Sequence, residues 1–399
     1  MPVIEAARVP FAPAPNNFNT MSQHQVMIIA GEVSSDQHAS DLVRCIREKS
    51  PETEFFGIGG DLMRREGVEV LYDVKDMAVM GLTEVLQRLG FFYKVFTDML
   101  NVARERRPNA VILVDYPGFN LRFAAKVHRE GLKVIYYICP QVWAWNRSRI
   151  ARMAHVVDRL ITIFPFEKSC FSETQLPVDF VGHPLVDISR NVLAMSDISL
   201  PWRGKPRVAL LPGSRLHEIE RLLPDMWNAA SDLDARHPEI SFLIASPNSE
   251  MSSVIHRVIE KTPGGPARWD CVTGHTRHIL RQADAAIVAS GTATIEAAMM
   301  RCPMVIVYRV APLSYFFGKM LVHVDNIGMV NIIAGKRICP ELLQQSVNGH
   351  AIANAIDPLL VDTDARADTL RELEIVIGAL GDGGAGTKAA QIVLDELTL

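Results

Sequence analysis

The stretch RVALLPGSRLHEIERLLPDMWNAASDLDAR, residues 207–236, indicates the fold class. Residues 207–211 form a short apolar run, a Pro-Gly-Ser turn follows, and residues 216–236 repeat apolar side chains at helical spacing. A strand that passes through a tight turn into a helix is typical of the βαβ unit, in which consecutive strands run parallel. The sequence therefore predicts a parallel α/β sheet around this stretch.

Outward from this stretch, strands and helices alternate over most of the chain. Further strands are predicted at residues 241–245, 285–289 and 304–308 downstream, and at residues 26–30, 54–58, 69–71, 110–114, 133–138, 159–163 and 179–181 upstream. A polar stretch at residues 191–205 interrupts the pattern and is typical of a linker. We therefore expect an α/β protein with two Rossmann-like domains facing across a cleft, the first at residues 25–200 and the second at residues 201–365.

The two ends of the chain fall outside this pattern. Residues 1–24 hold several prolines and asparagines without periodicity, so we expect a disordered extension, or residues upstream of a start near Met21. Residues 366–399 contain helical patterns separated by a glycine cluster at residues 381–386. We expect C-terminal helices there that can cross back to the first domain.

Composition and charge exclude several classes of function. The chain has 399 residues and a formal net charge of −4, and no run of Lys and Arg is long enough for a nucleic-acid groove. Its six cysteines are scattered without a C-x-x-C pair, which argues against a metal site and favours free thiols in a reducing cytoplasm. No apolar stretch reaches the roughly 18 residues of a membrane span.

The turn at Gly213, Ser214 and Arg215 has the composition of a phosphate site. It places backbone N–H groups, a hydroxyl and a guanidinium at the N-terminus of a predicted helix. Such a combination binds phosphate through backbone donors, the helix dipole and a bidentate arginine. The alternative is an ordinary tight turn with a solvated arginine.

A second glycine turn follows the strand predicted at residues 285–289. Gly291 lets a ligand approach the backbone, Thr292 can cap the next helix, and Thr294 lies in the same turn. Glu296 lies one turn into the helix, where a carboxylate can bridge two ribose hydroxyls; its alternative role is to compensate the helix dipole. Because two such turns follow strands of one sheet, we expect a nucleotide diphosphate beside them.

Loops after the strands of the first half carry polar and aromatic side chains that can line the cleft. They are Glu32, Ser34 and Asp36 after the first strand, Asp115 and Asn120 after residues 110–114, Gln141 and Trp143 after residues 133–138, and His183 after residues 179–181. Each has a structural alternative: Asp36 can cap a helix, Trp143 can pack in a core, and His183 can be a satisfied loop histidine.

A set of ordered runs covers residues 30–344: AGEVSSD, VMGLTEVL, DYPGFN, CPQVWAW, FPFEK, VGHPLVD, LLPGSR, SGTATIEA and NIIAGKRICPELLQ. In this order they resemble the signature of the lipid-A-disaccharide synthases, whose fold is the GT-B type. The resemblance implies an inverting glycosyltransferase that joins UDP-2,3-diacylglucosamine to 2,3-diacylglucosamine 1-phosphate (lipid X). The implied products are a β(1→6) lipid A disaccharide 1-phosphate and UDP.

The resemblance also implies where the substrates bind. The UDP-sugar is expected in the second domain, with Asn331 in a donor-side loop of the catalytic cleft. The acceptor lipid is expected in the first domain, near Ser34, Asp36, Asn120, Gln141 and Trp143. No cofactor or metal is implied. One departure concerns the run Pro117-Gly118-Phe119-Asn120, because the family often has an aspartate where this chain has Gly118.

An inverting transfer needs a base to take the proton from the acceptor's 6-hydroxyl. Asp115 is the leading candidate, because it follows a buried-looking strand where partial desolvation raises the pKa of a carboxyl toward neutrality. Glu32 at the end of the first strand is the main alternative. His183 is third, since the ordinary pKa of histidine suits the task. The structural alternative for Asp115 is a cap on the loop that leads to Phe119 and Asn120.

Residues 77–100 are too apolar for a one-sided surface helix and too interrupted by charge for a span. A diacylated substrate favours a membrane-facing or acyl-binding surface there, with Met80, Phe91 and Phe92 as contacts; the alternative is a buried core helix. We therefore expect a peripheral enzyme on the cytoplasmic face of the inner membrane of a Gram-negative bacterium, and a homodimer is compatible with the sequence.

Two other functions fit part of this pattern. A UDP-sugar 2-epimerase needs the same nucleotide turns but not the PQVWAW and VGHP loops. A non-catalytic lipid-binding relative is compatible with Gly118.

Overall fold

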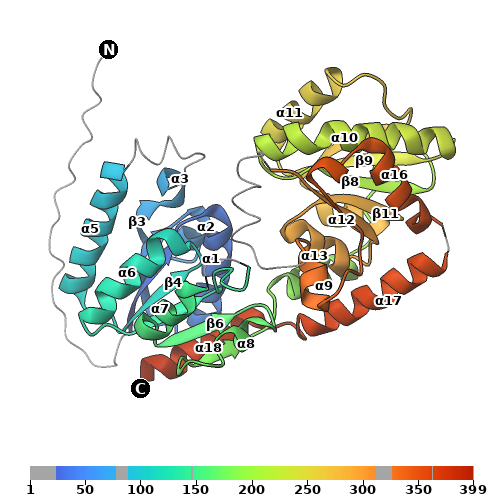
Figure 1. Cartoon of the computed structure of the whole chain (residues 1–399). Helices are drawn as coiled ribbons and strands as arrows, with labels where there is room; N and C mark the ends of the chain where they lie inside the picture. Colours follow the sequence, from blue (N-terminus) through green and yellow to red (C-terminus); the bar gives the residue numbers. More distant parts are fainter. Residues whose placement is uncertain (1–23, 78–88, 145–146, 311–325, 362, 399) are drawn as a thin grey trace, which may run out of the picture.

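The computed structural model describes residues 24–77, 89–144, 147–310, 326–361 and 363–398. The extension expected at residues 1–24 therefore lies outside the described residues, apart from His24. Figure 1 shows two lobes, each built from a sheet covered by helices.

The described part of the first lobe holds a sheet of seven parallel strands in the order β3-β2-β1-β4-β5-β6-β7. The strands are β1 (Gln25–Ala30), β2 (Glu54–Gly59), β3 (Glu69–Asp73), β4 (Ala110–Val114), β5 (Val134–Tyr137), β6 (Arg159–Thr162) and β7 (Val178–Phe180). The strand order reverses between β1 and β4, and the pairing of Ala30 with Val114 sets the carboxyl ends of these two strands side by side. This is the doubly wound arrangement predicted from the sequence.

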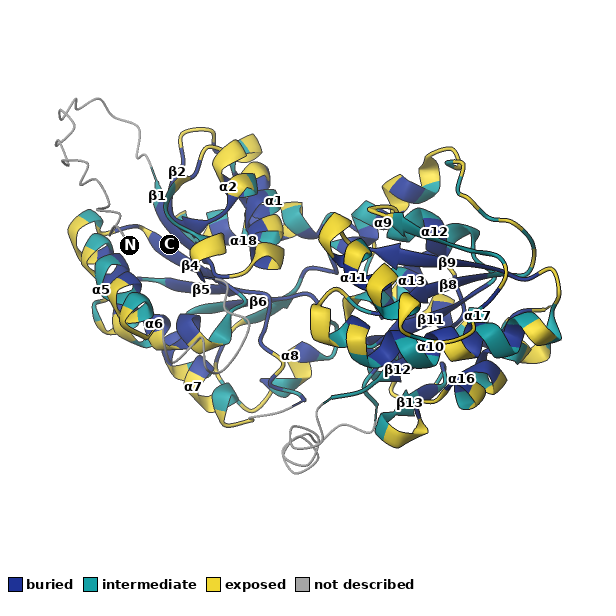
Figure 2. Ribbon diagram, turned by 90° about the horizontal axis from the view of Figure 1, so that it is seen from above, coloured by how far each residue is buried: buried dark blue, intermediate teal, exposed yellow. Residues whose placement is uncertain are grey.

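Helices cover both faces of this sheet because its strands are apolar on both sides. They are α1 (Val33–Lys49), α2 (Asp61–Arg65), α3 (Val74–Met77), α5 (Leu89–Arg106), α6 (Pro117–Arg129), α7 (Ser148–Val156) and α8 (Glu167–Cys170). Met27 and Ile29 of β1 lie in one core with α5, α6 and α7, whereas Val26 and Ile28 lie in another core with α1. Figure 2 shows the strands as the most deeply buried parts of both lobes.

The second lobe repeats this plan. Among the described residues its sheet has six parallel strands in the order β10-β9-β8-β11-β12-β13. They are β8 (Arg207–Leu211), β9 (Ser241–Ser246), β10 (Trp269–Thr273), β11 (Ala285–Ala289), β12 (Met304–Tyr308) and β13 (Glu341–Leu343). Its helices are α10 (Leu216–Arg236), α11 (Ser249–Glu260), α12 (Thr276–Gln282), α13 (Thr292–Met299), α15 (Met329–Ala334), α16 (Gly349–Ile356) and α17 (Asp364–Ala379). Helix α9 (Leu185–Ala194), which precedes β8 in the chain, also packs on this lobe, against α12 and α13. The order reverses between β8 and β11, which are hydrogen-bonded neighbours.

The structure confirms the helix predicted at residues 216–236 and differs elsewhere in identifiable ways. Strands β10 and β13 were not predicted, because β10 is a partly exposed edge strand with a polar sequence and β13 has only three residues. Helix α9 reaches Ala194, so the expected linker is helical at its start. Helices α1 and α6 begin at Val33 and Pro117, so they include residues that the sequence analysis placed in the loops after β1 and β4.

The C-terminal helix α18 (Ala385–Thr398) packs on the first lobe although the preceding helix α17 packs on the second. Figure 1 shows α18 beneath the first sheet, beside β6. Ala389 and Val393 of α18 lie in the same core as α1. At the far end of the helix, Glu396 pairs with Lys133 at 3.2 Å. The first sheet is therefore covered on one face by residues that follow the whole second lobe in the chain.

The chain crosses between the lobes twice, at residues 183–187 and at residues 380–384, and hydrogen bonds join the two segments. The His183 amide donates to the Leu380 carbonyl at 2.9 Å, and the Gly384 amide donates to the Asp187 carboxylate at 2.8 Å. Phe164 packs against a core of each lobe. The junction is thus a pair of adjacent chain crossings packed on aromatic side chains.

Candidate functional site

The two glycine turns of the second lobe lie at the reversal point of its sheet. Because β8 and β11 are neighbours in parallel register, the turn at Gly213 and the turn at Gly291 leave the same sheet edge side by side. In open α/β sheets this edge is where ligands bind. Gly213 and Gly291 have φ of +112° and +148°, a backbone region that L side chains rarely adopt, so both turns require glycine.

A carboxylate already occupies the donors of the first turn. The amides of Ser214 and Arg215 both donate to Oε2 of Glu218, at 3.0 and 3.2 Å, and the Arg215 guanidinium lies 3.5 Å from Oε1. Sequence reasoning missed Glu218, although a glutamate three residues after the residue that precedes a helix is the signal of a capping box. The turn is therefore an anion site that the chain fills with its own glutamate.

The second turn differs from the sequence prediction in its cap. Gly291 occupies the N-cap position of α13 and Thr292 is the first helical residue, so the prediction that Thr292 caps the helix is wrong. Thr292 is exposed, whereas Thr294 is fully buried and its hydroxyl donates to the Gly291 carbonyl at 2.8 Å. Thr294 thus holds the turn and Thr292 faces outward.

Glu296 lies one turn into α13 and is held by an arginine. Its Oε1 lies 2.7 Å from Nη2 of Arg277, which belongs to α12. The side chain of Glu296 keeps 18% of its surface exposed, so the ion pair orients the carboxylate and leaves it reachable. Arg277 is another residue that sequence reasoning missed, since it precedes Glu296 by nearly twenty positions.

The structure contradicts the prediction that Asn331 lies in a ligand cleft. Asn331 is fully buried, and its amide nitrogen donates to the Cys339 carbonyl and to Oε1 of Glu341, at 2.8 and 2.7 Å. Its amide oxygen accepts from the backbone of Ile338 and Cys339. A side-chain amide offers two donors and one oxygen with two lone pairs, and all of them are used inside the protein. Asn331 therefore fixes the loop between α15 and β13.

In the first lobe, the reversal point brings two carboxyl groups together. Glu32 follows β1 and Asp115 follows β4, the neighbouring strand. The loops are in contact, because a Cβ on Gly31 would lie 2.2 Å from the ring of Tyr116. Burial raises the pKa of Asp115 to about 6, and the negative charge of Glu32 adds to the rise. Glu32 itself is exposed.

Two residues predicted to bind the acceptor have structural roles instead. The buried Asp36 carboxylate accepts from the amides of Gly60, Leu62 and Met63, at 2.6, 3.1 and 3.3 Å, so it caps α2. Asn120 is fully buried and donates to the Asp115 carbonyl at 2.7 Å. Neither side chain can reach a lipid without leaving these partners. Ser34 and Gln141, in contrast, are exposed.

His183 cannot serve as the base proposed from its ordinary pKa. The Leu185 amide donates to Nδ1 of His183 at 3.1 Å, so the lone pair of Nδ1 is occupied and the proton of the neutral ring lies on Nε2. Burial, and to a smaller extent the nearby His38, lower the pKa of His183 to about 3. The ring stays neutral and offers a donor rather than an acceptor.

Trp143 lies at the junction rather than in an open loop. It is half-buried, and its ring meets that of Phe166 edge-on, with the centroids 5.2 Å apart. Next to these rings lies Glu167, which sequence reasoning did not single out. Burial raises the pKa of Glu167 to about 8, and its Oε2 accepts from the Phe164 amide at 3.1 Å.

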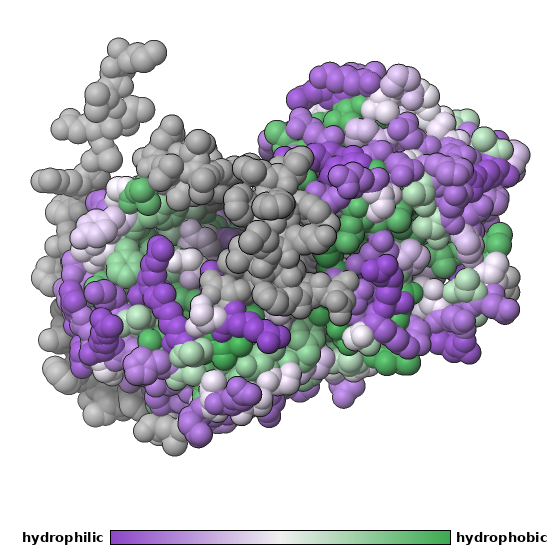
Figure 3. All heavy atoms as spheres, in the orientation of Figure 1, coloured by the Kyte–Doolittle hydropathy of each residue, from purple (hydrophilic) through white to green (hydrophobic). Residues whose placement is uncertain are grey.

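The expected membrane segment is only partly described. Met80 lies outside the described residues, and Phe91 and Phe92 are half-buried against the core of the first lobe. Leu89 and Tyr93 of α5 are exposed to 53% and 75%. Over the described residues, no helix combines the length and apolarity that crossing a bilayer requires. In Figure 3 polar side chains cover much of the second lobe, and apolar ones gather where the lobes meet.

Comparison with known proteins connects this geometry to one family. The family model for lipid-A-disaccharide synthetase matches residues 26–383. A lipid-A-disaccharide synthase of Myxococcus xanthus is 37% identical over 381 residues, covering 94% of this chain and 97% of that protein. The corresponding protein of Geobacter metallireducens is 40% identical over 383 residues, covering 95% and 98%.

Solved structures share the fold at low identity. A UDP-GlcNAc 2-epimerase of Methanocaldococcus jannaschii, solved with UDP-GlcNAc and UDP, superposes with a TM-score of 0.62 at 11% identity, covering 93% of this chain and 99% of that chain. CalG4, the calicheamicin glycosyltransferase, gives a TM-score of 0.59 at 15% identity, covering 95% and 99%. Both support the GT-B type of fold, and the likeness to epimerases is one of shape alone.

The paired carboxyl groups of the first lobe give a direct prediction for titration. A ¹³C NMR titration of the ligand-free protein should place the pKa of Asp115 near 6, and Glu32→Gln should lower it because a neighbouring negative charge is lost. Since folding raises this pKa, the free energy of unfolding falls as pH rises from the ordinary aspartate pKa toward 6. Asp115→Asn should remove that fall. An Asp115 midpoint at the ordinary value would contradict the pairing.

Proposed function

The chain belongs to the lipid-A-disaccharide synthase family, and we propose that it joins UDP-2,3-diacylglucosamine to 2,3-diacylglucosamine 1-phosphate, releasing UDP. It is a glycosyltransferase of that family. The observation that carries the substrate assignment is the pairing of two sites at two sheet reversals. One offers backbone amides and an arginine to an anion, and the other offers a carboxylate with a raised pKa.

The donor binds the second domain in this proposal. The UDP diphosphate replaces the Glu218 carboxylate on the amides of Ser214 and Arg215, and the Arg215 guanidinium pairs with it. Gly291 and Thr292 contribute the N-terminus of α13, while Thr294 keeps that turn in shape. Glu296, oriented by Arg277, accepts hydrogen bonds from the ribose hydroxyls.

The first domain supplies the base in this proposal. Asp115 takes the proton from the acceptor's 6-hydroxyl as that oxygen attacks the anomeric carbon of the donor. The bond between that carbon and the diphosphate oxygen breaks, and UDP leaves with the electron pair. A carboxyl with a pKa near 6 is mostly ionised at neutral pH yet basic enough to accept a proton. Glu32 raises that pKa and is the alternative base.

Peripheral membrane contact is also proposed, through the start of α5. Leu89 and Tyr93 lie four residues apart, and so on the same face of the helix. Both are exposed while the neighbouring Phe91 and Phe92 pack inward. An exposed apolar pair beside a lipid-handling domain is suited to the interface between headgroups and acyl chains.

The competition between Glu218 and the diphosphate can be measured by calorimetry. Glu218→Gln keeps an acceptor for the two amides but removes the negative charge, so UDP should bind about tenfold more tightly, because like charges a few ångströms apart repel. Arg215→Ala should weaken UDP binding by about 1.5–3 kcal/mol, the range for a hydrogen bond to a charged group. Weaker UDP binding by Glu218→Gln would show that the carboxylate prepares the turn instead of competing.

The role of the base can be tested with both substrates present. Asp115→Asn should lower kcat by roughly 10²–10⁴, the usual loss for a general base, and should not lower the melting temperature at pH 8. Glu32→Gln should have a smaller effect. If Glu32→Gln is the more damaging change, Glu32 is the base.

The same assay separates the alternative functions. A new UDP-sugar formed without acceptor would support an epimerase. Absence of any turnover in the unsubstituted protein would support a lipid-binding relative.

Membrane contact can be tested by sedimentation with anionic phospholipid vesicles. Replacing both Leu89 and Tyr93 with Ser should weaken vesicle binding at least about tenfold, since burying a large apolar side chain contributes about 1.5–3 kcal/mol. Ile375→Ser, which removes an apolar side chain that is 64% exposed on α17 of the second lobe, is the matched control and should bind like the parent. Equal binding by all three proteins would locate the contact elsewhere.

A further inference from the structure

The turn that carries Asp115 has an unusual backbone. Asp115 and Tyr116 have φ of +48° and +47°, and neither is glycine. A non-glycine residue in this left-handed region is disfavoured by roughly 1–2 kcal/mol, and here two of them are consecutive. Such conformations persist only where surrounding interactions over-determine them, and they gather at functional sites.

Two side chains restrain this turn by donating hydrogen bonds to the same carbonyl oxygen. The Tyr136 hydroxyl, rising from β5, donates to the Asp115 carbonyl at 2.6 Å. The Asn120 amide nitrogen, from the first turn of α6, donates to the same oxygen at 2.7 Å. On the other side of the residue, the Asp115 amide donates to the Tyr137 carbonyl at 3.0 Å. Both hydrogen-bonding groups of the strained peptide backbone of Asp115 are therefore fixed.

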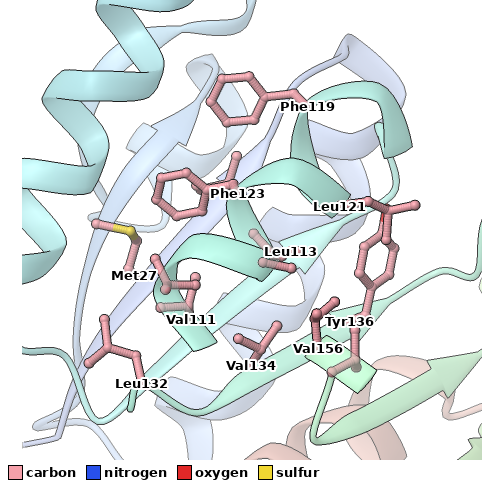
Figure 4. Close-up of a cluster of buried hydrophobic side chains, with 14 of the residues drawn as sticks. Met27, Val111, Leu113, Phe119, Leu121, Phe123, Leu132, Val134, Tyr136 and Val156 are labelled. Carbon is pink, nitrogen blue, oxygen red and sulfur yellow. The ribbon is translucent and has the colours of Figure 1, made fainter. Parts of the chain in front are cut away.

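Tyr136 is well suited to act as a permanent donor. Its side chain is completely buried in the core beneath α6, and Figure 4 shows its ring extending from β5 toward Leu121. Burial raises the pKa of the hydroxyl above its ordinary value, and the charge of Asp115 raises it further, so the proton stays on the oxygen. A phenylalanine ring would fill the same space without the hydroxyl. Among the described residues, the hydroxyl of Tyr136 donates its hydrogen bond to the Asp115 carbonyl.

We propose that Tyr136 and Asn120 are positioning residues, which clamp the Asp115 carbonyl and thereby hold the base carboxylate in the attack geometry. The proposal rests on the base role assigned to Asp115 above. The two hydrogen bonds of the clamp go to the backbone carbonyl of Asp115 and not to its carboxylate, which is the group proposed to meet the acceptor hydroxyl. Without the clamp the turn relaxes, the carboxylate gains water, and its orientation relative to the acceptor becomes variable.

Several titratable groups face this turn and bear on its pH dependence. Glu32 comes from the loop after β1, Tyr116 from the turn itself, Cys139 from the loop after β5 and Glu167 from α8. Of these, Glu32 raises the pKa of Asp115. Burial raises the pKa of Glu167 to about 8, above the pKa of about 6 of Asp115, so we expect Glu167 to affect the alkaline limb of the activity profile. The acid side of the profile therefore reports Asp115.

The test compares two adjacent tyrosines of β5. Tyr136→Phe removes the hydroxyl that holds the turn, whereas Tyr137→Phe removes a hydroxyl from an equally buried ring on the opposite face of the sheet and keeps the backbone carbonyl that accepts from Asp115. Tyr136→Phe should lower kcat at least about tenfold, with KM for both substrates within about twofold, and should move the acid limb of kcat/KM to lower pH. Tyr137→Phe should match the parent in all three measurements.

The double variant Tyr136→Phe with Asp115→Asn separates this inference from the proposed function. If Tyr136 acts through Asp115, its loss has no further effect on kcat in the Asp115→Asn protein. An impaired Asp115→Asn beside an unimpaired Tyr136→Phe overturns the clamp alone, and an active Asp115→Asn overturns the base assignment itself. An effect of Tyr136→Phe that persists undiminished in the Asp115→Asn background also overturns the clamp.

Asn120→Ser provides a second variant should Tyr136→Phe fail to fold. It removes the other donor to the same oxygen and should show the same fall in kcat with an unchanged KM. UDP binding by calorimetry checks that the second domain is intact in every variant. An Asn120→Ser protein with the parent's kcat and acid limb would overturn the proposal.

Discussion

Both halves of the chain depend on one constraint of parallel sheets. Each parallel strand must be followed by a crossover connection to the next strand. Where the crossovers change direction, the chain leaves two neighbouring strands toward opposite faces of the sheet, and a crevice remains outside their carboxyl ends. Those places lie between β1 and β4 in the first sheet and between β8 and β11 in the second. Glu32, Asp115, Arg215 and Gly291 each follow one of these four strands within a few residues. Strand order thus sets where the chemistry can take place before any side chain is chosen.

Helix N-termini at and near these places need acceptors for their free amides, and the chain supplies two of its own carboxylates. Asp36 accepts three amides at the start of α2 and is buried with them. Glu218 accepts two amides at the start of α10, beside an Arg215 side chain that is 65% exposed. In the proposed donor site a ligand anion replaces the second carboxylate, whereas the first is enclosed by the protein. The difference between a structural cap and a ligand site is therefore the access of solvent, which the motif alone does not reveal.

Sequence periodicity was sufficient to predict a strand or helix where one pattern dominates. Examples are the continuous apolar run AVILV of β4 and the 21 residues of α10. It failed for β10, whose half-exposed residues lack a clear period. The predictions of side-chain roles were wrong for a different reason. The partners of Asn331 lie seven to ten positions away, and those of Asp36 lie 24 to 27 positions away. A short motif shows that a polar residue is present, but only the folded chain shows whether its hydrogen bonds are already used.

The tight turns of the two domains place different residue types at positive φ, and this difference is related to the proposed function of each turn. In the second domain Gly213 and Gly291 adopt positive φ without strain because glycine has no Cβ, and the proposed donor site uses backbone amides, so it needs no side chain at those positions. In the first domain Asp115 and Tyr116 adopt positive φ although glycine would relieve the strain. Glycine at position 115 would, however, remove the carboxyl whose pKa burial and Glu32 have raised. If Asp115 is the base, as proposed, the reaction and not the fold accounts for the strain that Asn120 helps to hold at this residue.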